Sequence, residues 1–315
     1  MPKKLFSIKI FCLIFAIPSI CFAFFGRVEF NLGDDFTENS VRRGIKAEKG
    51  TCEKLNPGAM WAQVTPEIGE CIKYWSAGLT AATDRTIVFF HGDVEASGPL
   101  TDHTKLSGER LSSLAQSWSR HLKAPYIYIG RPGTHGSSGE HSRRRMLEEA
   151  EVLSKVLNGL RERYGIREFI VAGQSGGGHV TASLLTLRED IVCAVPTSSP
   201  SSPRVRYLKM GRLRDITNYE SYEPTEHLKD NLVHPKLRVF ILGDPRDSNV
   251  FWESQIVLAP ALKLRGIEHA ILEGEATGQT HHGLSNSARY IAGLCYHNKS
   301  SDEIKNYLVE RKIKG

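Results

Sequence analysis

Short apolar runs separated by amphipathic stretches dominate the chain after residue 84. The runs are rich in Ile, Val, Phe and Leu, and they lie at residues 87–90, 126–129, 169–172, 191–195, 239–242 and 270–272. Runs of this length that alternate with helical patterns indicate βαβ units, and the near absence of polar positions within them is typical of strands covered on both faces. The pattern predicts an α/β protein with a mainly parallel sheet.

One predicted helix, between the second and third of these runs, has a distinct apolar face. Its apolar side chains recur at spacings of three and four, at Met146, Ala150, Leu153, Leu157, Leu160 and Tyr164. Gly165 then follows as a helix stop. We expect this helix to lie against the sheet.

Two other stretches depart from the alternating pattern. Residues 24–84 are irregular, with candidate strands at 27–31 and 73–79, and we interpret them as an N-terminal extension that packs on the sheet. Residues 197–234 begin with Ser/Pro-rich sequence and continue with a polar stretch that contains Tyr207, Tyr219 and Tyr222. Long irregular insertions in compact domains are usually functional or disordered. We interpret this one as a small cap within a main domain of residues 85–315, and a disordered surface excursion is the alternative.

The first 23 residues have the features of a secretory signal. Lys3, Lys4 and Lys9 precede or adjoin the apolar run 10–20, and the sequence Cys21-Phe22-Ala23 ends on a small residue. We expect cleavage after Ala23 and a secreted or periplasmic protein with no membrane attachment in its mature form. An uncleaved anchor is the competing interpretation, although the run is short for a bilayer span. Cleavage before Cys21, as in a lipoprotein, is disfavoured by the bulky Ile20.

The charge of the chain offers little support for nucleic-acid binding. Its formal net charge of +6 falls by three when the signal lysines leave. The basic clusters 143–145 and 311–314 lack interleaved aromatic residues, so we interpret them as exposed helix faces.

Four cysteines remain after the signal: Cys52, Cys71, Cys193 and Cys295. An even number in an oxidising compartment predicts disulfides, and four cysteines allow three connectivities. We favour a bridge between Cys52 and Cys71, while Cys193 lies in an apolar run where an unpaired core cysteine is the alternative. No CxxC pair is present, so a zinc site is not expected.

The most informative motif is Gly173-Gln174-Ser175-Gly176-Gly177, a G-x-S-x-G pattern between an apolar run and a helix-compatible segment. A strand that turns sharply into a helix exposes the serine oxygen, and glycine neighbours leave room for the adjacent backbone. Ser175 is therefore the predicted nucleophile. A phosphate-binding glycine loop is the alternative, but the motif lacks the lysine of a P-loop.

A serine nucleophile needs a base and an acid to orient it, and after this motif the acid precedes the histidine along the chain. Two loops after apolar runs supply them: one contains Asp244 and Asp247, the other His281 and His282. We favour Asp247, which precedes a D-x-x-V step, and His282, which precedes Gly-Leu. A turn-capping aspartate and a surface histidine pair are the alternatives.

The first apolar run leads into His91-Gly92-Asp93, where a second oxyanion donor is needed. We expect the backbone N–H groups of Asp93 and Gly176 to form the oxyanion hole. The carboxylate of Asp93 would repel an oxyanion unless its side chain points away from the site.

Residues 84–296 resemble the α/β-hydrolase superfamily. The stretches 131–139 and 173–178 are similar to the catalytic domains of prolyl-oligopeptidase-like peptidases and dienelactone-hydrolase-like esterases. The resemblance implies a doubly wound, mostly parallel sheet of the α/β-hydrolase type with a small cap insertion, and an acyl-enzyme mechanism without metal or cofactor. The chain is too short to add the N-terminal propeller of prolyl oligopeptidases.

The predicted function is hydrolysis of a small ester, or an amide, through Ser175. Peptidase activity on short peptides is the alternative, followed by acyl transfer to an alcohol and by a binding protein that retains the fold without the chemistry.

Overall fold

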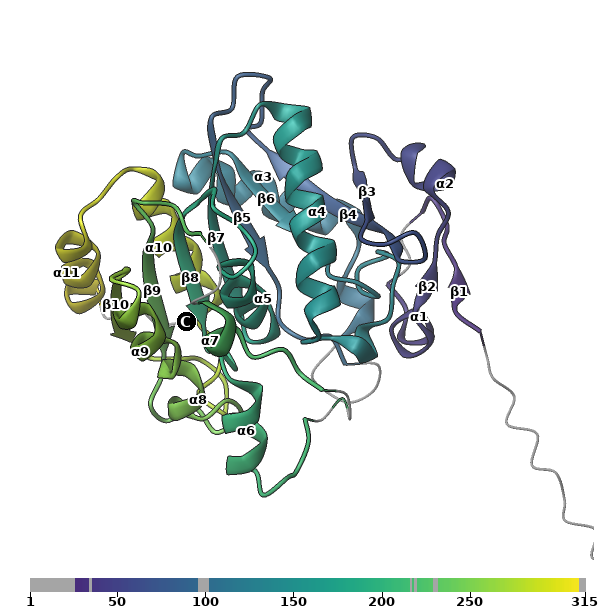
Figure 1. Cartoon of the computed structure of the whole chain (residues 1–315). Helices are drawn as coiled ribbons and strands as arrows, with labels where there is room; N and C mark the ends of the chain where they lie inside the picture. Colours follow the sequence, from purple (N-terminus) through teal and green to yellow (C-terminus); the bar gives the residue numbers. More distant parts are fainter. Residues whose placement is uncertain are drawn as a thin grey trace, which may run out of the picture.

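The computed structural model describes residues 26–311, with gaps at 34–35, 96–101, 216, 218–219 and 229–231. The predicted signal, its cleavage site at Ala23, and Tyr219 of the predicted cap lie outside the described residues. A mixed sheet of eight strands forms the centre of the molecule (Figure 1), in the order β10-β9-β8-β7-β5-β6-β4-β3. Six of these strands match the apolar runs: β5 (Arg85–Phe90), β6 (Tyr126–Ile129), β7 (Glu168–Gln174), β8 (Ile191–Thr197), β9 (Arg238–Gly243) and β10 (Glu268–Glu273). They pair in parallel, which confirms the predicted fold class.

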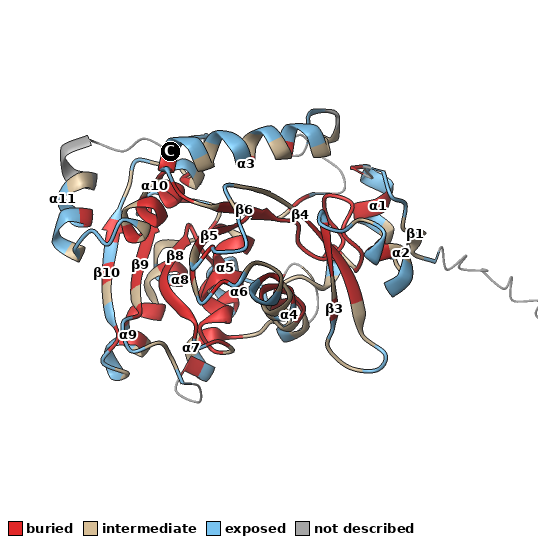
Figure 2. Cartoon of the chain, turned by 90° about the horizontal axis from the view of Figure 1, so that it is seen from above, coloured by how far each residue is buried: buried red, intermediate tan, exposed pale blue. Residues whose placement is uncertain are grey.

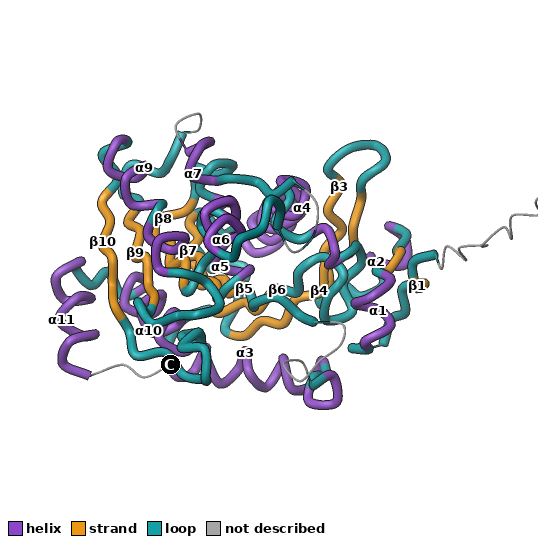
Figure 3. The backbone as a smooth tube through the Cα atoms, turned by 90° about the horizontal axis from the view of Figure 1, so that it is seen from below, coloured by secondary structure: helices purple, strands orange, loops and turns teal. Residues whose placement is uncertain are grey.

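Helices cover both faces of this sheet. Successive residues of each strand point to opposite sides, and both sets are apolar, so each face packs against helices. In β5, Val88 and Phe90 pack under one helix layer, and Ile87 and Phe89 pack under the other. The first layer contains α4 (Leu147–Tyr164), α5 (Gly176–Leu184) and α9 (Leu258–Leu264); the second contains α3 (Gly108–Leu122), α10 (Ser285–Tyr296) and α11 (Ser301–Arg311). Figure 3 shows the strands between these layers, and Figure 2 shows how deeply they are buried. The sheet is thus doubly wound.

The predicted helix on the second crossover is α4. Its apolar stripe, from Ala150 to Leu160, is buried. Gly165 caps it in the left-handed conformation, with φ 73°, and its N–H donates to the carbonyl of Arg161 over 2.9 Å. Glycine adopts this conformation without the steric cost that a Cβ brings, so the helix ends there.

The N-terminal extension contributes strands to the sheet itself. β4 (Gly69–Ala77) pairs antiparallel with β6, and β3 (Ala59–Gln63) pairs antiparallel with β4 at the edge. β3 was not among the expected strands. The remaining elements of the extension lie beyond this edge: β1 (Val28–Glu29), α1 (Glu38–Arg43), β2 (Ile45–Lys46) and α2 (Lys49–Glu53).

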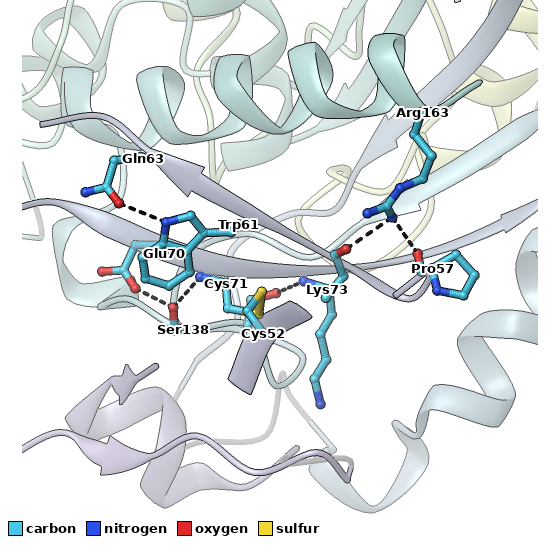
Figure 4. Close-up of a disulfide and its surroundings, with 11 residues drawn as sticks. Cys52, Pro57, Trp61, Gln63, Glu70, Cys71, Lys73, Ser138 and Arg163 are labelled. Atoms are coloured by element: carbon cyan, nitrogen blue, oxygen red, sulfur yellow. Dashed lines mark hydrogen bonds between the residues drawn. A yellow bond between two sulfur atoms is a disulfide. The ribbon is translucent and has the colours of Figure 1, made fainter. Parts of the chain in front are cut away.

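The described part of the chain contains two disulfides, one within the N-terminal extension and one between segments that are 102 positions apart. The predicted Cys52–Cys71 bridge is confirmed, and it ties α2 to β4 (Figure 4). Next to it, the N–H of Cys71 donates to Ser138 Oγ over 2.7 Å, and Ser138 Oγ donates to Glu70. Cys193 of β8 bonds to Cys295 of α10, so the alternative of an unpaired core cysteine does not hold.

The segment 197–234 leaves the carboxyl end of β8, and its described residues include the short helices α6 (Pro203–Lys209) and α7 (Pro224–His227). Its Ser/Pro-rich beginning is buried from Ser198 to Pro203. α6 packs on α8 (Trp252–Ile256), which follows β9. Within the described ranges, no helix is both long and apolar enough to cross a bilayer.

Candidate active site

Ser175 lies on the tight turn that joins β7 to α5. Its backbone has φ 57° and ψ −122°, a conformation that a residue with a side chain rarely adopts. Other backbone approaches the glycines of this turn very closely, and the turn is possible because glycine has no Cβ at these points. A Cβ on Gly173 would lie 2.1 Å from the carbonyl oxygen of Gly177, and one on Gly177 would lie 2.2 Å from that of Phe90. The G-x-S-x-G spacing therefore has the steric role that the sequence indicated.

The structure brings Asp247 and His282 together. His282 Nδ1 lies 2.7 Å from Asp247 Oδ2, and the Asp247 side chain is fully buried. The other oxygen of Asp247 accepts the N–H groups of Asn249 over 2.8 Å and Val250 over 2.9 Å. His282 Nε2 is buried and has no hydrogen-bond partner among the described residues. With the carboxylate accepting from Nδ1, this second nitrogen is the basic one.

Gln174, which precedes Ser175, holds the histidine loop beside the turn. Its Nε2 donates to the carbonyl of His282 over 2.6 Å, and its Oε1 accepts the N–H of Leu284 over 3.1 Å. Both groups of one amide therefore fix the backbone on either side of Gly283. His282 is brought next to the serine turn by this contact.

The neighbouring candidates have other contacts. Asp244 accepts hydrogen bonds from Arg246 Nη2 over 2.7 Å and from the N–H of Ala276 over 3.0 Å. Burial raises the pKa of Asp244, but these hydrogen bonds outweigh burial and lower the pKa to about 2. Asp244 thus stabilises its own turn and ties it to the segment that follows β10. His281 has φ 52° and its N–H donates to Gly278, so it belongs to the turn that precedes His282.

The turn His91-Gly92-Asp93 lies directly against the serine. A Cβ on Gly92 would lie 3.4 Å from the Ser175 Cβ. The next N–H, of Val94, donates to His141 Nε2 over 3.1 Å, and burial holds the pKa of His141 well below its ordinary value. A neutral imidazole therefore accepts this hydrogen bond and orients the turn. Gly176 opens α5, where the N–H groups of the first turn lack acceptors within the helix.

The carboxylate of Asp93 does not turn away from the site. Its Oδ1 would lie 1.9 Å from a Cβ on Gly176, and three guanidinium groups surround it. Arg131 Nη1 donates over 2.9 Å, Arg144 Nε donates over 3.1 Å, and Arg145 Nη1 donates as well. Burial raises the pKa of Asp93, but the charges of Arg145, Arg131 and Arg144 outweigh it and hold the pKa well below its ordinary value. The negative charge near the expected oxyanion hole is therefore compensated.

The interpretation of the basic cluster 143–145 as an exposed helix face is wrong. The cluster lies in the short helix η2 (His141–Arg143) and the turn before α4, and the Arg145 side chain is 1% exposed. Arg145 also donates from Nε to Asp215 Oδ2 over 2.7 Å, while Arg131 donates to Glu149 over 2.8 Å. One feature of the sequence could have predicted this network. Asp93 is an acid at a position where an oxyanion donor is expected, and a partly buried carboxylate there requires nearby cations.

The segment that contains α6 also supports the Asp247 loop. Arg206 of α6 is 8% exposed. Its Nε donates to the carbonyl of Asn249 over 3.0 Å, and its Nη2 donates to Asn249 Oδ1 over 2.9 Å. Two contacts to one residue hold the backbone two positions after Asp247.

Solved structures show which known fold this arrangement belongs to. An acylaminoacyl peptidase in complex with Z-Gly-Gly-Phe-chloromethyl ketone aligns with 76% of this chain at 17% identity and a TM-score of 0.50. The uncomplexed acylaminoacyl peptidase of Pyrococcus horikoshii aligns with 76% at 15% identity, also with a TM-score of 0.50. The fold is that of the α/β-hydrolases.

This chain spans 40% of the length of each of these peptidases. Est1E from Butyrivibrio proteoclasticus, with bound ferulic acid, aligns with 80% of this chain and 99% of its own at 12% identity and a TM-score of 0.49. No protein-family model and no curated protein matches the sequence.

Proposed function

We propose that this protein hydrolyses an ester, or an amide, through an acyl-enzyme on Ser175. The observation that carries the proposal is the 2.7 Å contact between His282 Nδ1 and Asp247 Oδ2, with His282 Nε2 buried and unpartnered in the described part of the chain. A buried polar atom without a partner is rare in a folded protein, and a general base before it meets its proton donor is one explanation.

In the proposed reaction, Ser175 Oγ attacks the carbonyl carbon of the substrate while His282 Nε2 takes the serine proton. Asp247 holds the tautomer and stabilises the imidazolium ion. The N–H groups of Gly176 and Asp93 stabilise the oxyanion. His282 then gives the proton to the departing alcohol or amine, which leaves the acyl group on Ser175. Water then attacks the acyl-enzyme while His282 takes a proton from it, and His282 returns that proton to Ser175 Oγ as the bond between the serine and the acyl group breaks and the acid leaves.

The arginine contacts of the Asp93 side chain support the proposed role of the Asp93 backbone N–H as an oxyanion donor. Removing a single oxyanion donor costs a typical enzyme of this kind about 10²–10³ in kcat, so the position of such a donor matters. A carboxylate held by Arg131, Arg144 and Arg145 keeps the Asp93 backbone in one place. The same cations reduce the repulsion that the carboxylate exerts on the oxyanion.

We also propose that residues 1–23 direct export and that the mature protein is secreted or periplasmic. Two disulfides support this location, because such bonds persist in oxidising compartments.

The test of the catalytic proposal is labelling of the purified protein with a fluorophosphonate probe, followed by peptide mapping. We expect label on Ser175 and none in Ser175→Ala. With a chromogenic ester, Ser175→Ala is expected to lose on the order of 10⁴ or more in kcat. Ser113→Ala, at an exposed position on α3, is the matched control and should keep wild-type turnover.

A folded protein that neither reacts with the probe nor hydrolyses any ester or amide would instead be a binding protein with the hydrolase fold. A panel of matched esters and short peptides separates esterase from peptidase activity once Ser175 is labelled.

A further inference from the structure

A cavity of about 690 Å³ lies in the segment that contains α6 and α7. Its walls come from the start of α4, from α6 and from residues 214–215 and 220–227. The volume is in the range of small-molecule sites in proteins. None of the proposed catalytic residues lines it.

One wall of the cavity is nevertheless joined to the proposed oxyanion hole. Asp215 lines the cavity and accepts two hydrogen bonds from Arg145, whose third nitrogen reaches Asp93 beside Gly176. A single guanidinium group thus separates the cavity wall from the Asp93 carboxylate. A second link starts one turn after Ser175, where His179 Nε2 lies 2.8 Å from the carbonyl oxygen of Tyr222, another lining residue. The cavity and the nucleophile are neighbours in the fold.

Carboxylates outnumber guanidinium groups in the cavity lining. Three of its acids already have partners: Glu148 pairs with Arg143, Asp215 with Arg145 and Glu226 with Arg204. The acids Glu220 and Glu223 have no ion pair within the described residues, and Arg214 is the remaining cation of the lining. The cavity therefore has unneutralised negative charge.

Glu223 adds a second observation. The residue is 7% exposed, and its Oε1 accepts the N–H of Arg204 over 2.7 Å. Its Oε2 is buried without a hydrogen-bond partner in the described part of the chain. Buried carboxylate oxygens normally accept a hydrogen bond, so this oxygen is suited to a donor that arrives with a ligand.

Aromatic rings complete the lining. The rings of Tyr222 and His227 stack with centroids 4.8 Å apart and planes at 10°. The hydroxyl of Tyr222 lies 2.8 Å from Thr186 Oγ1, which holds the ring in place. Tyr207 adds a further aromatic side chain. Aromatic faces attract cations, as carboxylates do, and they also pack against the apolar stem of a long basic side chain.

We propose that this cavity binds an ammonium or guanidinium group of the substrate, so that the protein prefers esters or peptides with a basic side chain close to the bond that Ser175 attacks. This inference rests on the proposed function. Glu220 and Glu223 supply the charge, and the tyrosines supply the walls.

The test uses chromogenic esters and amides of acetyl-lysine, acetyl-arginine, acetyl-norleucine and acetyl-glutamate, which differ in one side chain. We expect kcat/KM for the basic substrates to exceed that for norleucine by about 10- to 200-fold, a range typical of pocket discrimination. The glutamate substrates should be the poorest. Equal or better turnover of the norleucine substrates overturns the proposal.

Two variants locate the effect. Glu220→Gln and Glu223→Gln should each reduce the ratio of kcat/KM for the lysine substrate to kcat/KM for the norleucine substrate by about 10-fold, because the charged contact is lost. Glu162→Gln is the control: Glu162 is exposed near the end of α4 that lies away from the cavity. Circular dichroism checks that each variant is folded. If the variant of the buried Glu223 is unstable, the variant of the exposed Glu220 still tests the proposal. A preference that survives both substitutions contradicts the assignment.

A binding measurement separates this inference from the proposed function. Ser175→Ala protein is titrated with acetyl-arginine amide and with acetyl-norleucine amide by calorimetry, which requires no turnover. Selective binding of the arginine compound that weakens in the Ser175→Ala/Glu220→Gln double variant supports the cavity even if Ser175 is never labelled. Labelling of Ser175 without selective binding leaves the hydrolase proposal standing and removes this one.

Discussion

Gln174 and His282 are joined by a hydrogen bond of 2.6 Å from the side-chain amide of one to the backbone carbonyl of the other. The two residues are 108 positions apart in the sequence. Gln174 ends the strand that leads to Ser175, and His282 carries the proposed base. The contact therefore sets the proposed nucleophile and base relative to each other through the backbone, while leaving the His282 imidazole free to contact Asp247.

We predict that Gln174→Ala slows catalysis without weakening substrate binding. Loss of the amide loosens the His282 loop, and small misplacements of a base cost up to about 10²-fold in rate. Steady-state kinetics with a chromogenic ester should show kcat reduced by about 10- to 100-fold and KM nearly unchanged. Gln63→Ala, on an exposed edge position of β3, is the control. A rise in KM at constant kcat would mean that Gln174 binds substrate and does not position the base.

Substitution of neighbouring residues tests the proposed relay. His282→Ala should lose on the order of 10³-fold or more in kcat, and His281→Ala should retain most activity, because His282 alone of this pair contacts Asp247. For the acids, Asp247→Asn should lower kcat far more than Asp244→Asn, which weakens only the contacts of Asp244 with Arg246 and with the N–H of Ala276. If His281→Ala is inactive while His282→Ala turns over normally, the two roles are exchanged.

The charge of Asp93 should make stability depend on acid pH. Its pKa is lowered in the folded protein, so its contribution to stability is present above the unfolded-state pKa of about 4 and is lost as pH falls below that value. Urea unfolding of the wild type between pH 7 and pH 3 should therefore show a fall in the free energy of unfolding that is smaller in Asp93→Asn.

At neutral pH, Asp93→Asn should itself destabilise the protein by about 3–5 kcal/mol, because Arg131 and Arg145 stay buried with less compensation. Asp84→Asn, which removes an exposed pair with Arg167, is the matched control and should have little effect. Equal stability of Asp93→Asn and wild type at neutral pH would show that the network contributes nothing to folding.

The two disulfides should differ in their contribution to stability. Cys52–Cys71 spans 19 positions and Cys193–Cys295 spans 102, and a bridge that closes a longer loop removes more entropy from the unfolded chain. Replacing both cysteines of a bridge with serine should cost about 3 kcal/mol for the first and about 5 kcal/mol for the second by this model. Thermal unfolding of the two double variants checks the order. Mass spectrometry of the unreduced secreted protein should find no free thiol in residues 52, 71, 193 and 295.

The sequence by itself determined the features that depend on a few consecutive residues. Ser175 lies on the turn that the glycines around it predict, because steric limits on φ and ψ act within the motif. The six apolar runs became the parallel strands, because a strand buried on both faces requires apolar residues at nearly every position. The apolar stripe that ends before Gly165 became α4, because a helix buried on one face requires apolar residues at spacings of three and four. The Cys52–Cys71 bridge was also within reach, since both cysteines lie in one short irregular segment.

Only the tertiary structure decided which side chains meet when they come from distant segments. Asp244 and Asp247 have similar sequence surroundings, yet Asp244 contacts Arg246 and Ala276 while Asp247 contacts His282, because the path of the loops fixes the direction of each side chain. Arg131 and Arg145 converge on Asp93 from 38 and 52 positions away. Local patterns carry no information on such contacts, because they depend on how whole strands and helices pack. The same reason explains why the edge strand β3 and the Cys193–Cys295 bridge became evident only in the folded chain.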